Sequence, residues 1–168
     1  MEPTIKEQFL TAYDAYADAL FRHCYFRVYN RELAKDLVQE TFCRTWTYLS
    51  QGKEVKNIRA FLYRLLHNVI VDEIRRKKPL SLDQLVEEGY SPKDESAPDM
   101  EQHLVVKDIV QKLRMLDESY RDIMQMRFVD DLSPKEISAV LGVSENVVSV
   151  RIHRGTNKLR QLVEKGLK

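Results

Sequence analysis

The chain has 168 residues, and its 27 Lys and Arg nearly balance its 26 Asp and Glu. With 43% hydrophobic and 32% charged residues it has a globular composition, and only five glycines and five prolines argue against a turn-rich all-β fold. There is no apolar run of about 18 residues, and the N-terminal residues MEPTIKEQFL do not resemble a signal peptide. We therefore expect a cytoplasmic, mainly helical protein with no direct insertion into a membrane.

The net charge of +1 hides two basic blocks. Residues 1–78 contain 14 basic and 10 acidic residues, residues 79–103 contain one and seven, and residues 104–168 contain 12 and nine. The middle segment also holds three of the five prolines and no sustained helical period, a composition that does not bury enough surface to fold. We predict an all-α protein in which two small helical domains, 1–78 and 104–168, are joined by a flexible acidic linker, 79–103.

The N-terminal block is predicted to be a helical bundle. Apolar residues recur at helical spacing from Phe9 to Tyr29. Asn30 is then an N-cap for a second helix, RELAKDLVQETFCRTWTYLS, which ends near Gly52. A third helix is expected from about Ile58 to about Lys77, with a wide apolar face.

Polar residues lie beside the apolar faces of the second and third helices. The second helix presents four such residues opposite its apolar stripe: Asp36, Gln39, Glu40 and Cys43. The third helix carries Arg64, Asn68 and Arg75 along the edge of its stripe, and basic residues follow as far as Lys78. Several aromatic residues occur nearby in sequence, and basic groups with aromatic groups suit single-stranded nucleic acid. A solvated basic helix end beside core aromatic residues explains the same pattern.

The C-terminal block is also predicted to be helical. Helices are expected over residues 104–116 and 118–128, followed by two short helices and a long final one. Ser133 is an N-cap, Pro134 occupies the first helical position and Glu136 completes a capping box. Gly142 then supplies a tight turn, and Ser144 caps the next helix.

A short helix, a glycine turn and a second helix with a polar outer face predict a helix-turn-helix. The second helix buries one face, formed by Val148, Ile152, Gly155, Leu159 and Leu162. Its outer face carries Asn146, Ser149, Val150, His153 and Asn157, flanked by Arg151 and Arg154. Such a helix fits the DNA major groove, where polar side chains reach base edges and arginines reach phosphates. The alternative is an α-hairpin with a solvated face.

Two stretches of sequence resemble the conserved regions of a bacterial extracytoplasmic-function sigma factor of the sigma-70 family. The first is DLVQETFCRTW with AFLYRLLHNVIVDEIRRKK, and the second is YRDIMQMRFVDDLSPKEISAVLGVSENVVSVRIHRGTNKLR. The resemblance covers nearly the whole chain. It implies an initiation factor that joins core RNA polymerase, at the beta-prime clamp and the beta flap, and directs it to particular promoters. It also implies control by an anti-sigma factor.

The resemblance assigns roles to individual residues. Docking on the polymerase clamp is implied for Asp36, Leu37, Gln39, Glu40 and Phe42. Opening of the minus-ten element, with capture of a flipped base of the non-template strand, is implied for Lys53, Lys56, Asn57, Arg64, Asn68, Arg75 and Arg76. Reading of the minus-thirty-five duplex is implied for Asn146, Ser149, Val150, Arg151, His153, Arg154 and Lys158. For the acidic linker two roles stay open, a soluble tether and a nucleic-acid mimic inside polymerase channels.

Other functional classes fit the sequence less well. A one-component helix-turn-helix regulator, acting without polymerase, is the main alternative. An enzyme is not expected, because the chain has no Gly-rich phosphate loop and no HExxH or CxxC motif. His23, Cys24 and Cys43 are too few ligands for zinc, so no metal or cofactor is predicted. Both cysteines are expected to be small buried hydrophobic residues.

Overall fold

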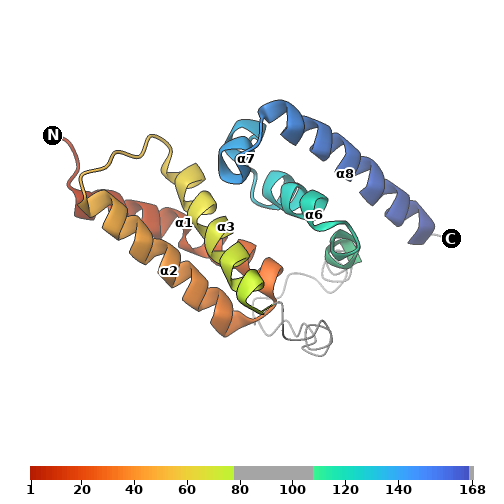
Figure 1. The fold of residues 1–168 in the computed structure, drawn as a ribbon, viewed down its shortest axis with the longest axis horizontal. Helices are drawn as coiled ribbons and strands as arrows, with labels where there is room; N and C mark the ends of the chain where they lie inside the picture. The colour runs from red at the N-terminus through yellow and green to blue at the C-terminus, as the bar shows by residue number, and fades with distance from the viewer. Residues whose placement is uncertain (78–107, 167–168) are drawn as a thin grey trace. The chain divides into compact units, whose positions relative to one another are not determined.

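A computed structural model describes residues 1–77 and 108–166 of the chain, which divides into two compact units (Figure 1). Within those ranges every regular element is a helix, so the predicted all-α fold with two helical units is confirmed. The acidic segment 79–103 and both predicted domain boundaries lie outside the described residues, so the boundaries stay predictions. None of the described helices is long and apolar enough to cross a membrane.

The N-terminal unit consists of three helices, α1 (Ile5–Val28), α2 (Arg31–Ser50) and α3 (Ile58–Lys77). Side-chain caps set where they begin. The Asn30 Oδ1 accepts the backbone N–H of Leu33 at 2.9 Å, and the Asn57 Oδ1 accepts that of Ala60 at 3.0 Å. The predicted starts and ends of α2 and α3 are therefore confirmed.

The three helices pack against one another around a core drawn from all of them. Leu20 of α1 and Leu62, Leu66 and Ile70 of α3 are completely buried. The predicted stripe of α2 supplies its share, because Ala34, Leu37, Val38, Thr41, Phe42, Thr45 and Leu49 are all buried. Two buried threonines fit this core because Thr41 and Thr45 donate to the carbonyls of Leu37 and Thr41, each at 2.8 Å.

The two cysteines have opposite surroundings. Cys24 is completely buried in α1, and burial raises the pKa of its thiol to about 12, against a smaller opposing effect of the Arg27 charge. Cys43, by contrast, is exposed on α2. The prediction that both are buried is therefore wrong for Cys43, because it falls on the polar side of α2 beside Gln39 and Glu40.

The C-terminal unit begins in the described residues with a helical stretch over 108–114. It continues with α6 (Glu118–Met124), one π-helical segment, η1 (Gln125–Val129), and then α7 (Pro134–Leu141) and α8 (Glu145–Gly166). The sequence predicted one regular helix over 118–128, whereas the structure changes hydrogen-bond register after Met124. It also predicted two short helices before a long one, whereas the second short helix and the long helix form the continuous α8.

The helix-turn-helix forms as its caps predict. The Ser133 Oγ accepts the Glu136 N–H at 3.1 Å, and the Glu136 carboxylate accepts the Ser133 N–H at 2.9 Å. Gly142 then ends α7 with φ at 68°, a left-handed conformation that glycine adopts without strain. Ile137 and Val140 of α7 and Val148 of α8 are buried, as the predicted apolar faces of these helices require.

Candidate nucleic-acid interface

An open groove of about 700 Å³ runs between α2 and α3, and we call it the α2–α3 groove. Its lining comes from both helices and includes Glu40, Arg44 and Tyr48 of α2 and Phe61, Arg64 and Asn68 of α3. Arg64 and Asn68, predicted to contact the minus-ten element, are exposed and lie one helical turn apart on the same wall. The structure therefore brings these two residues to one surface.

Aromatic rings form part of this groove. The Tyr48 and Phe61 ring centroids are 4.8 Å apart, and the Lys53 ammonium lies 4.9 Å from the Tyr48 ring centroid. Lys53 thus extends the groove toward the connection before α3, where Lys56 and Asn57 are exposed. Part of Asn57 is already used, because its side chain caps α3. Basic groups beside half-buried aromatic rings that line a groove suit a single strand of nucleic acid.

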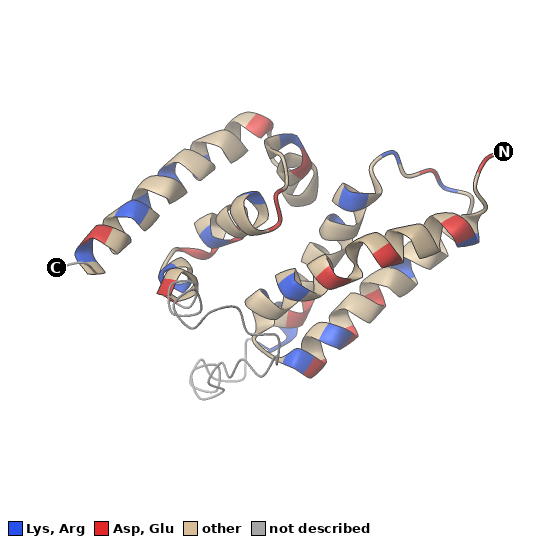
Figure 2. Ribbon diagram, turned by 180° about the vertical axis from the view of Figure 1, so that it is seen from behind, with Lys and Arg blue, Asp and Glu red and all other residues tan. Residues whose placement is uncertain are grey.

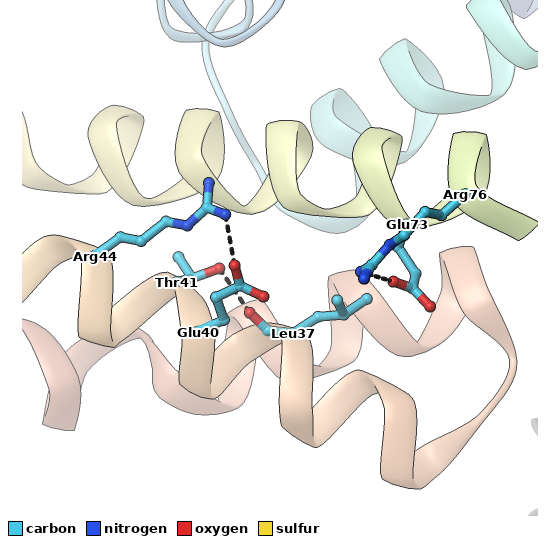
Figure 3. A network of polar contacts seen from close by, with 6 residues as sticks. All are labelled: Leu37, Glu40, Thr41, Arg44, Glu73 and Arg76. Atoms are coloured by element: carbon cyan, nitrogen blue, oxygen red, sulfur yellow. Dashed lines mark hydrogen bonds and ion pairs between the residues drawn. The ribbon is translucent and has the colours of Figure 1, made fainter.

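The basic end of α3 contains an internal counter-charge (Figure 3). Glu73 is 9% exposed and pairs with Arg76 at 2.6 Å and with Lys77 at 3.3 Å. Arg76, predicted to contact DNA, therefore has part of its guanidinium engaged by a carboxylate three residues earlier. Arg75 is exposed on the same end of the helix. The sequence motif alone did not distinguish the two arginines.

The predicted polymerase-docking residues of α2 separate into two groups. Asp36, Gln39 and Glu40 are exposed, as a contact surface requires. Leu37 and Phe42 are each only 4% exposed, and the Leu37 carbonyl accepts the Thr41 hydroxyl (Figure 3). Leu37 and Phe42 therefore belong to the core that orients α2, and their predicted docking role stays a prediction.

An aromatic groove of about 760 Å³ lies between α1 and α2, and sequence reasoning missed it. The Phe9 ring contacts Phe42 and Trp46 at centroid distances of 6.0 and 5.3 Å, and Tyr13 lies 4.8 Å from Phe42. Tyr13 is 47% exposed and Trp46 43% exposed. The signal available in the sequence was the spacing of four within each pair, Phe9 with Tyr13 and Phe42 with Trp46, which places each pair on one helix face.

The outer face of α8 carries the residues predicted for the minus-thirty-five element. Five are exposed, Asn146, Ser149, Val150, His153 and Arg154, whereas Arg151 is half-buried. Lys158 differs from them, because its ammonium lies 3.8 Å from the Asp117 carboxylate and 5.0 Å from the Tyr120 ring centroid. Lys158 thus links α8 to the start of α6. Figure 2 shows basic residues at intervals along α8.

Phe128 and Val129, at the end of η1, are 60% and 49% exposed. The Arg127 guanidinium lies 5.9 Å from the Phe128 ring centroid. The sequence prediction placed Phe128 at the end of a regular helix and gave it no surface role. Two adjacent exposed apolar side chains on a small unit form a contact surface that a partner can cover.

Two family models match the chain, Sigma-70 region 2 over residues 12–79 and Sigma-70 region 4 over residues 107–159. The first match contains most of α1 and all of α2 and α3, and the second contains α6, α7 and most of α8. Each structural unit therefore corresponds to its own conserved region of the same family.

Whole-chain comparisons agree with these matches. The ECF RNA polymerase sigma factor SigW of Bacillus subtilis is 29% identical over 170 residues, which cover 93% of this chain and 89% of SigW. The ECF RNA polymerase sigma factor SigE of Mycolicibacterium smegmatis is 30% identical over 153 residues, which cover 89% of this chain and 59% of SigE.

Two solved structures share the fold, each with a TM-score of 0.69. One is CnrH in complex with the cytosolic domain of CnrY, 23% identical over 94% of this chain and 88% of CnrH. The other is the sigma factor RpoE in complex with the anti-sigma factor NepR from Bartonella quintana, 21% identical over 95% of this chain and 96% of RpoE. The chain belongs to the sigma-70 family and is an ECF RNA polymerase sigma factor.

Proposed function

We propose that this sigma factor holds core RNA polymerase with the exposed face of α2, binds the opened minus-ten element in the α2–α3 groove and reads the minus-thirty-five duplex with α8. Binding of core polymerase and recognition of promoters are the functions of its family. The observation that carries the assignment of surfaces is the groove, which Tyr48, Phe61, Arg64 and Asn68 line together. The Lys53 ammonium lies 4.9 Å from the Tyr48 ring centroid.

The groove matches the physical demands of promoter opening. Extruding a base from the duplex costs a few kcal/mol, so a site that compensates this cost must already be formed. Stacking of a base on an aromatic ring contributes about 1–3 kcal/mol, and cationic groups offset phosphate charge. Asn68 offers both a donor and an acceptor beside these rings, which suits hydrogen bonding to a base edge.

The α8 surface matches duplex recognition. Ser149, Val150 and His153 lie near its N-terminal half and are exposed, where they can face base edges. Arg154 joins this surface, whereas Lys158 is assigned a weaker part because Asp117 already engages it. The half-buried Arg151 is assigned to phosphate, which supplies affinity without sequence preference.

The remaining partners follow from exposed surfaces and from relatives. Phe128 and Val129 are assigned to a contact with the polymerase beta flap. Both side chains are apolar and exposed, so an apolar partner surface would remove them from water, whereas a charged surface would not. An anti-sigma factor is proposed as a regulator, since RpoE of Bartonella quintana was solved with one. The protein acts in the cytoplasm, with polymerase and DNA, as a non-catalytic initiation factor.

Run-off transcription with purified core polymerase tests the proposal. The chain should start a specific transcript from a duplex promoter, and core alone should not. A one-component regulator would bind duplex DNA but leave core inactive at every promoter, which would refute the proposal. A randomised promoter library in the same assay would give the preferred sequences.

A further inference from the structure

A single carboxylate stands at the border of two proposed surfaces. Glu40 belongs to the exposed face of α2 assigned to polymerase, and it also lines the α2–α3 groove. One helical turn later, Arg44 lines the same groove and pairs with Glu40 at 2.5 Å (Figure 3). The two side chains are 44% and 47% exposed, so both are accessible to other partners.

Arg44 supplies a guanidinium from α2 to the lining of the groove, to which α3 contributes Arg64. Tyr48 and Phe61, with ring centroids 4.8 Å apart, line the groove together with these arginines. A single strand whose bases stack on the rings would bring its phosphates within reach of either wall. A guanidinium has five N–H donors in a planar fork that matches phosphate oxygens. Its ion pair with Glu40 engages one nitrogen and offsets its charge.

We propose that Arg44 binds a backbone phosphate of the single strand in the α2–α3 groove, and that Glu40 restrains it until polymerase engages the Glu40 carboxylate. The proposal rests on the proposed function in assigning Glu40 to the polymerase surface. The exchange is energetically feasible because an exposed ion pair of this kind is weak and can be displaced by another partner. The free protein would then bind single-stranded DNA less well than the same groove within the holoenzyme.

The first experiment uses the full chain without polymerase and a fluorescent single-stranded oligonucleotide at several salt concentrations. Glu40→Gln keeps the side-chain size and removes the charge, so it should tighten binding about two- to fivefold. It should also steepen the slope of log K against log salt concentration by about 0.7, which corresponds to one further phosphate contact. Glu40→Gln combined with Arg44→Gln should show no gain over Arg44→Gln. An unchanged slope in Glu40→Gln would overturn the restraint by Glu40.

Glu32→Gln is the matched control. Glu32 lies on the same helix, is 80% exposed, and pairs with Lys35 at 3.3 Å, outside the α2–α3 groove. Glu32→Gln changes the net charge by the same amount as Glu40→Gln. The proposal requires Glu32→Gln to leave affinity and slope within error of the original chain. A gain equal to that of Glu40→Gln would show a general charge effect and would refute the specific role of Arg44.

The second experiment uses holoenzyme and a fork-junction promoter with a single-stranded minus-ten region. Arg44→Gln should weaken binding several-fold and reduce the salt slope by about 0.7, and Arg44→Lys should restore the slope with part of the affinity. Equal slopes for Arg44→Gln and the original chain would refute the phosphate contact. If the original chain forms no holoenzyme, the proposed function fails instead, and the polymerase-free experiment still decides the relation between Glu40 and Arg44.

Discussion

Gly155 of α8 lies directly against the side chain of Met124 at the end of α6. A Cβ at position 155 would be 3.0 Å from both the Cγ and the Sδ of Met124, and the Tyr120 ring would follow at 3.6 Å. Gly155 and Met124 are both buried. The glycine therefore lets α8 approach α6 more closely than any side chain allows, and this approach orients the face of α8 assigned to DNA.

Gly155→Ala should destabilise the protein although alanine favours helix. Overpacking a core costs about 1–3 kcal/mol, and alanine returns about 1 kcal/mol of helix propensity, so we expect a net loss of about 1 kcal/mol in the free energy of unfolding. In a Met124→Ala background the clash is absent, and the same substitution should stabilise the protein instead. Urea unfolding of the four proteins measures this. Equal effects in both backgrounds would show that Met124 does not set the distance.

Arg154→Ala should weaken binding to a minus-thirty-five duplex. Arg154 is exposed on the outer face of α8, and losing a contact with a specific base costs about 1–3 kcal/mol and relaxes preference at one position. Affinities for a set of singly substituted duplexes, measured at constant salt, test this. A uniform loss across all duplexes would assign Arg154 to phosphate rather than to a base.

Asn68→Ala should impair promoter opening while leaving holoenzyme formation intact. Asn68 is exposed on the α3 wall of the α2–α3 groove, so its loss removes hydrogen bonds without removing core packing. Reactivity of unpaired thymines with permanganate reports opening, and a core pull-down reports assembly. If the pull-down loses the protein, the Asn68 side chain is structural.

Asp36→Arg should impair holoenzyme formation itself. Asp36 is exposed on the face of α2 assigned to polymerase, and a reversed charge opposes a complementary partner surface. We expect loss of the protein from the core pull-down, with unchanged thermal unfolding. Asp14→Arg on α1 is a control of equal charge change at an exposed site outside both grooves. Retention of Asp36→Arg on core would move the docking surface away from Asp36.

The two thiols should differ in reactivity. Burial raises the pKa of Cys24 to about 12, so its reactive thiolate is scarce at pH 7 to 9, whereas the Cys43 thiol is exposed. Iodoacetamide followed by mass spectrometry should label Cys43 in the folded protein and Cys24 only after unfolding. Raising the pH from 7 to 9 should leave Cys24 unlabelled, because the folded state holds the proton until the pH approaches the raised pKa. Rapid native labelling of Cys24 would contradict its burial.

Local chemistry explains why the helix boundaries were predictable. Asn30 and Ser133 each accept a backbone N–H three residues later, and these contacts depend on nothing beyond their own segment. The buried and exposed faces of α8 were predictable for the same reason. The helical period alone places Val148 on the buried face and its neighbour Ser149 on the exposed face. The two conserved regions could be identified because their patterns are continuous in sequence.

The amino-acid sequence by itself determined the all-α class, the helix-turn-helix and the family, because each depends on spacing within one segment. Only the tertiary structure decided which side chains meet across segments. It joined Arg44 and Tyr48 of α2 with Phe61 and Asn68 of α3 in one groove, and it exposed Cys43 while burying Cys24. Contacts of this kind depend on how helices pack, and no period within a single helix encodes which neighbour will cover a given face.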